Sequence, residues 1–148
     1  MSKIYQRLSK HKAIILICFL FSCIYASISL VNHYNFRTYT YDIGSYTNAL
    51  YDYARFQWND SSSFLQTPQN LLADHFDLYL PIFSPLQYLF GSYTLLIVQL
   101  LAILIGGMGV YAYFRLKKTS QFLAISSAIY FYSFYGIYSA LALSLIHI

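Results

Sequence analysis

Three long apolar runs, separated by polar stretches, organise this sequence. They cover residues 13–31, 93–114 and 122–142, and none of them contains a charged side chain. Each run has close to the roughly 20 residues that an α-helix needs to cross the hydrocarbon core of a bilayer. The pattern therefore predicts an all-α integral membrane protein with three transmembrane helices.

The loop between the first two runs, residues 32–92, holds all the acidic chemistry of the chain. There is no glutamate, and every aspartate lies in this loop: Asp42, Asp52, Asp60, Asp74 and Asp77. Acid–base or ion-binding chemistry is therefore expected here, with the apolar runs as its scaffold.

Part of this loop has the periodicity of an amphipathic helix. Apolar side chains recur three or four residues apart at Ile43, Tyr46, Leu50 and Tyr53. We predict a helix over residues 43–58 that lies in the membrane interface with its apolar face toward lipid. Asp42 comes one residue earlier, where an N-cap carboxylate is favoured. On the polar face, Asp52 is expected to pair with Arg55.

The end of the loop is apolar again but is interrupted by prolines. Pro81 and Pro85 are four residues apart within residues 71–90. Because proline disrupts a helix interior, a short broken or re-entrant segment is predicted there rather than a straight spanning helix.

Charge sets the expected orientation. Only 9% of the residues are charged, against about 25% in soluble domains. Residues 1–12 carry four Lys or Arg, residues 115–121 carry three, and residues 32–92 carry two. The positive-inside rule then places the N-terminus in the cytoplasm and the loop outside.

Basic residues beside anionic lipid account for the pI near 9.0. Membrane lipids are therefore the expected partners, and nucleic-acid binding is not needed to explain the positive charge.

Both ends of the chain need interpretation. The first run exceeds the 7–15 apolar residues of a signal peptide, which favours an uncleaved helix. The last six residues, LSLIHI, are what a transposase adaptor sequence encodes in frame. We therefore expect residues 143–148 to be an adaptor-derived tail, although a natural apolar tail is the alternative, and the chain to be the N-terminal part of a longer multi-pass domain.

Several short motifs carry a family resemblance. They are Phe36-Arg37-Thr38, Tyr41-Asp42-Ile43-Gly44, Asp74-His75-Phe76 and Pro85-Leu86-Gln87-Tyr88. In order and spacing they resemble a bacterial family of predicted membrane proteins, the domain of unknown function two thousand and seventy-nine. The resemblance covers residues 32–142, with Asn48 where the family pattern has Gln and Leu78 where it has Pro. That family is in turn similar to type-C glycosyltransferases, membrane enzymes that use polyprenyl-phosphate sugars.

The resemblance implies the front part of a type-C glycosyltransferase-like fold in the bacterial cytoplasmic membrane. An inverting transfer needs a carboxylate that takes the proton of the acceptor, and the motif implies Asp42 for this role. Arg37 would bind the donor phosphate through a bidentate fork, and His75 would contact phosphate or acceptor. No cofactor is certain. A divalent metal held by Asp42, Asp74, His75 and Asp77 is one possibility.

Each assignment has a structural alternative. Asp42 would serve only as a helix cap, Arg37 as a headgroup anchor, and His75 as a local hydrogen-bond partner. For the whole protein, the alternative is a non-catalytic transporter or assembly subunit. A transporter is expected to carry polar or broken helices at the bilayer midplane, whereas the polar residues here gather outside the apolar runs.

Overall fold

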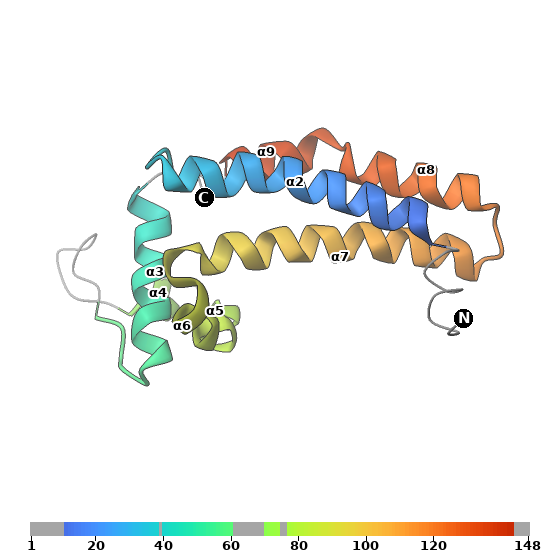
Figure 1. The fold of residues 1–148 in the computed structure, drawn as a ribbon. Coiled ribbons are helices and arrows are strands. Elements are labelled where there is room, and N and C mark those ends of the chain that lie inside the picture. The colour runs from blue at the N-terminus through green and yellow to red at the C-terminus, as the bar shows by residue number, and fades with distance from the viewer. Residues whose placement is uncertain (1–10, 39, 61–69, 75–76, 144–148) are drawn as a thin grey trace, which may run out of the picture. The chain divides into compact units, whose positions relative to one another are not determined.

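The computed structural model describes residues 11–38, 40–60, 70–74 and 77–143, with the side chains in these ranges except those of residues 40–42, 73, 74 and 143. Every regular element of these residues is helical (Figure 1). The chain divides into two compact units. We call residues 1–31 and 99–142 the spanning unit, and residues 32–98 with 143–148 the loop unit.

Two segments are long and apolar enough to cross a membrane. One is α2 (Lys12–Tyr34), with a mean hydropathy of 2.6, and the other is Tyr79–Leu116, with 2.2, which ends in α7 (Thr94–Leu116). Only 17% and 22% of their apolar windows are buried inside the protein, whereas the core helix of a soluble protein is mostly covered. These segments agree with the first two predicted spans.

The third predicted span, residues 122–142, is divided into α8 (Gln121–Tyr132) and α9 (Tyr135–Leu143). Three membrane-crossing helices are therefore not confirmed among the described residues. At the break, the hydroxyl of Tyr25 donates to the carbonyl of Tyr132 at 2.6 Å. A carbonyl at a helix end needs such a partner, and the hydrocarbon core has no water to supply one. The apolar pattern alone gives no sign of this contact.

Tyr132 is also the centre of packing in the spanning unit. Its hydroxyl donates to the carbonyl of Leu104 at 2.7 Å, and its ring stacks on Phe21 with centroids 5.0 Å apart. The ring lies directly against the Cα of Gly107, so that a Cβ at this position would overlap it. The buried core of the unit is apolar and aromatic: Ile14, Tyr25, Leu100, Tyr111, Ala124, Ala128, Tyr132 and Leu141.

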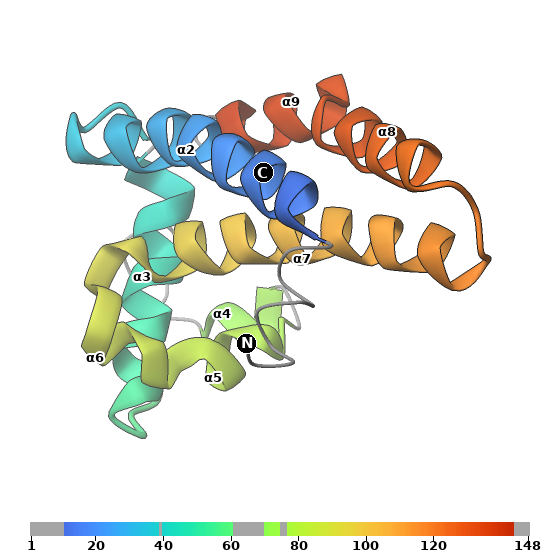
Figure 2. The same ribbon diagram turned by 45° about the vertical axis from the view of Figure 1, so that its right-hand side comes forward.

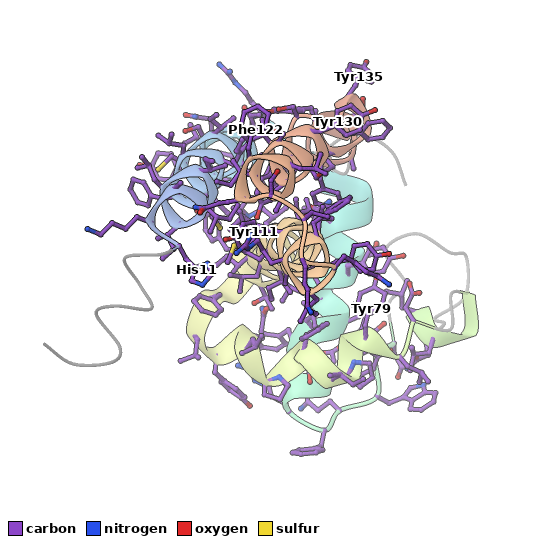
Figure 3. The ribbon with its side chains drawn as sticks, turned by 90° about the vertical axis from the view of Figure 1, so that its right-hand side faces the viewer. His11, Tyr79, Tyr111, Phe122, Tyr130 and Tyr135 are labelled. Atoms are coloured by element: carbon purple, nitrogen blue, oxygen red, sulfur yellow. The ribbon has the colours of Figure 1, made fainter. Side chains whose placement is uncertain are left out.

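The start of α2 is tied to α7, and aromatic rings cover the outside of α8 and α9. His11 Nδ1 lies 2.9 Å from the hydroxyl of Tyr111 (Figure 3).

Tyr130 in α8 and Tyr135 in α9 point outward in the same view and are 73% and 81% exposed. Cys18 and Cys23 are both free thiols. Exposed aromatic rings on apolar helices suit a surface that faces lipid.

In the loop unit, α3 (Thr40–Ala54) packs on four short elements (Figure 2). These are α4 (Leu71–Asp74), α5 (Tyr79–Phe83), η1 (Ser84–Leu86) and α6 (Gln87–Phe90), and η2 (Gly91–Tyr93) follows them. Pro81 lies in α5 and Pro85 in η1, so the predicted broken segment is confirmed.

Two predictions about α3 are wrong. Its apolar face contacts protein rather than lipid, since Ala49 and Leu50 are buried under the short elements. The helix also begins at Thr40 and not after Asp42. Asp42 is therefore in the first turn, where its own backbone is helical, and it is not the N-cap residue, which has non-helical backbone angles.

Candidate functional site

A groove of about 1010 Å³ opens within the loop unit. Its walls come from the end of α2 and the following connection, from α3, and from α6 and η2. The lining residues are His33, Tyr34, Asn35, Phe36, Thr38, Ile43, Gly44, Thr47, Asn48, Tyr51, Gln87, Ser92 and Tyr93. Its volume is at the upper end of the range of roughly 300–1,000 Å³ for small-molecule sites.

His33, near the end of α2, links the connection that follows this helix to η2. Its Nδ1 hydrogen-bonds with Thr38 Oγ1 at 3.1 Å, and its Nε2 with Ser92 Oγ at 3.0 Å. The ring also meets Tyr93 edge to face, with centroids 4.6 Å apart. Both ring nitrogens are thus oriented by hydroxyl groups, which accept or donate according to the tautomer. His33 was not among the site residues predicted from the sequence. The signal that could have indicated it is a histidine in the last turn of the first apolar helix.

The other polar groups of the lining are amides and hydroxyls. Gln87 is positioned by Thr94, whose hydroxyl lies 3.2 Å from Gln87 Oε1. Asn48 is exposed on the α3 wall, and Thr47 beside it is half-buried. Such side chains both donate and accept hydrogen bonds. Together with the rings of Tyr51 and Tyr93, they suit a ligand that has hydroxyl groups and apolar surface.

The three predicted site residues, Asp42, Arg37 and His75, differ in where they lie relative to the groove. Asp42 is in the first turn of α3 and directly precedes Ile43 and Gly44, which line the groove; its side chain lies outside the described part. Arg37 is exposed between the groove residues Phe36 and Thr38, and its backbone N–H donates to the carbonyl of Asn32 at 2.9 Å. His75 lies outside the described residues.

Asp77 is held by two tyrosines. Its Oδ2 accepts hydrogen bonds from the hydroxyl groups of Tyr46 at 3.2 Å and of Tyr79 at 3.4 Å. No group of three His, Cys, Asp or Glu side chains able to hold a metal occurs among the described residues. The suggested metal set depends on Asp42, Asp74 and His75, whose side chains are not described, so it stays a prediction.

Asp52 does not pair with Arg55, contrary to expectation. Asp52 Oδ2 instead accepts from Asn59 Nδ2 at 2.8 Å, and Asn59 is fully buried. Next to this pair, the Tyr53 hydroxyl donates to Asn70 Oδ1 at 2.7 Å. Burial raises the pKa of Tyr53, as the largest of several influences. These contacts hold Asn59 and Asn70 against α3, and none of these residues lines the groove.

Comparison with protein-family models shows the family to which this chain belongs. Residues 32–145 match the model described as predicted membrane protein (DUF2079). The chain belongs to this family. The match includes every residue of the groove, so the groove lies wholly inside the DUF2079 region. No significant match was found among curated proteins or among solved structures.

Proposed function

We propose that this DUF2079 protein is a glycosyltransferase-like membrane enzyme that transfers a sugar from a polyprenyl-phosphate donor at the outer face of the membrane. The observation that supports this best is the groove of about 1010 Å³ beside the first turn of α3. It combines amide and hydroxyl groups with aromatic rings, which suits a sugar, and it begins at the end of an apolar helix, which suits a lipid-linked donor.

Asp42 is the proposed general base. Its place in the first turn of α3 suits a carboxylate, because the partial positive charge of the helix N-terminus interacts favourably with negative charge there. The acceptor hydroxyl would attack the anomeric carbon while the bond from that carbon to the phosphate oxygen breaks. The proton passes to Asp42, and polyprenyl phosphate leaves.

Arg37 is the proposed phosphate ligand, because its guanidinium can form two parallel hydrogen bonds to phosphate oxygens. Its exposure and its position between Phe36 and Thr38 support this role. His75 stays a proposed contact to phosphate or acceptor. Among the groove residues, His33 is a second candidate for such a contact because it links the connection after α2 to η2.

The test is an Asp42→Asn variant assayed in membranes for consumption of a polyprenyl-phosphate sugar. Asparagine retains the size and hydrogen bonding of the side chain but cannot take up the proton, so the rate should fall by about 100- to 10,000-fold. Asp52→Asn is the matched control, since its amide oxygen can still accept from Asn59 Nδ2; it should retain its activity. Near-normal turnover of Asp42→Asn would contradict the assignment of Asp42 as the general base, whereas no donor consumption by the wild type would favour the non-catalytic alternative.

A further inference from the structure

Helix α3 ends in a way that is unusual for a phenylalanine. Phe56 has a φ of 56°, in the left-handed region. Its N–H donates to the carbonyl of Tyr53 at 3.1 Å, and the N–H of Gln57 donates to that of Asp52 at 2.9 Å. These two bonds form a Schellman motif, whose left-handed position is normally occupied by glycine. A residue with a Cβ is strained there.

No side-chain packing in the described protein offsets this strain, since the Phe56 side chain is 100% exposed. The same arrangement occurs at the end of α2, where Phe36 has a φ of 55° and is 95% exposed. Phe36 comes two residues after the end of a segment long and apolar enough to cross a membrane. If α2 crosses the membrane, Phe36 lies where the chain leaves the bilayer, and a lipid environment would accommodate rings that water does not.

An arginine accompanies each of these rings in the sequence, Arg37 after Phe36 and Arg55 before Phe56. The Arg55 guanidinium lies 3.4 Å from the centre of the Tyr51 ring and 5.4 Å from that of Tyr88. No described carboxylate forms an ion pair with Arg55, because Asp52 is engaged by Asn59. The positive charge is exposed and complements a lipid phosphate.

The end of α3 is also fixed close to the second membrane-crossing segment. The Tyr88 hydroxyl donates to the carbonyl of Ala54 at 2.8 Å. Tyr88 is six residues before Thr94, the first residue of α7, a distance of about 10 Å for helical backbone. The interfacial layer on each side of a bilayer is roughly 5–8 Å thick, so the end of α3 lies at most a few ångström beyond it, a distance that an aromatic side chain can span.

We propose that Arg55, Phe56 and Trp58 form a lipid anchor at the C-terminal end of α3. Phe56 and Trp58, which is 72% exposed, would enter the headgroup layer, and Arg55 would bind a lipid phosphate. The anchor holds one end of the groove wall at the membrane surface. It does not depend on the proposed transfer reaction.

The single tryptophan of the chain provides the test. The protein is reconstituted into nanodiscs whose lipids carry bromine either near the headgroup or at the end of the acyl chain, and Trp58 fluorescence is recorded. Shallow bromine should quench it more than deep bromine, and aqueous acrylamide should quench it weakly. Strong quenching by acrylamide without quenching by either lipid would overturn the proposal.

Variants separate the two components of the anchor. Phe56→Asn removes the ring but retains a residue that tolerates the left-handed conformation, and quenching by shallow bromine should be lost. Lys118→Asn is the matched control, because Lys118 has a φ of 56° at the end of α7 but contributes no ring; it should leave quenching unchanged. Arg55→Gln should abolish any increase in quenching with anionic lipid content. Wild-type quenching in Phe56→Asn, or a wild-type response of Arg55→Gln to anionic lipid, contradicts the anchor when helical content is intact by circular dichroism.

Discussion

Tyr53 shows how a single buried hydroxyl affects the stability of the loop unit. Because burial raises its pKa, the unfolded state loses the Tyr53 proton first as the pH rises past the ordinary value of 10.0. The unfolded state then binds fewer protons, and the free energy of unfolding falls with further increase in pH. Below that value the contribution of Tyr53 is fully present.

Tyr53→Phe should therefore lower the free energy of unfolding at neutral pH by about 1 kcal/mol, the net contribution of one hydrogen bond. It should also flatten the loss of stability at high pH. Unfolding of the detergent-solubilised protein, followed by circular dichroism at several pH values, measures both. Tyr51→Phe is the control, because it retains the ring under Arg55. If both variants behave alike, the hydrogen bond to Asn70 does not stabilise the fold.

Single residues were the hardest feature to predict from the sequence. The pairing of Asp52 with Arg55 follows from their spacing on a helix, but the turn at Phe56 brings Asn59 back to Asp52. His33 was missed because its partner Ser92 is 59 positions away along the chain. The position of Asp42 near the start of α3 was predicted to within one turn, but the helix begins at Thr40, so the capping hypothesis is wrong and the catalytic role stays a prediction.

At the scale of elements, the length of the apolar runs and the positions of the prolines predicted the helices correctly. The hydrophobic pattern did not predict what covers the apolar face of a helix. The first two spans and the broken segment follow from local sequence. The division between α8 and α9 does not, because Tyr25 stabilises it from 107 residues away. The amphipathic pattern of α3 correctly indicates that one face is covered, but it does not distinguish cover by protein from cover by lipid.

The contact between α7 and α8 gives a prediction at this scale. Gly107→Ala should destabilise the spanning unit by about 1–3 kcal/mol, because the added Cβ would overlap the Tyr132 ring and force it to move. Gly109→Ala provides the comparison, since a Cβ there meets nothing within 4 Å, and it should leave the stability near that of the wild type. Thermal unfolding in detergent reports the difference. Equal melting of the two variants would show that the Tyr132 ring does not pack on Gly107 as described.

For the whole molecule, hydropathy and charge predict a membrane protein, and membership of DUF2079 agrees with it. The groove could not be predicted, because its walls come from four separate parts of residues 32–98. Its proposed role requires that the loop unit face the outside of the membrane. The orientation rests on the distribution of Lys and Arg, with seven in residues 1–12 and 115–121 and two in residues 32–92.

Labelling of single cysteines in intact cells by a membrane-impermeant reagent tests this requirement most directly. After Cys18 and Cys23 are replaced by alanine, cysteine is introduced at one of two exposed positions, Asp60 in the loop unit or Lys117 after α7. We expect Asp60→Cys to be labelled from outside, and Lys117→Cys to be labelled only after the membrane is permeabilised. Labelling of Lys117→Cys but not of Asp60→Cys in intact cells would place the groove on the cytoplasmic side and contradict the proposed transfer at the outer face.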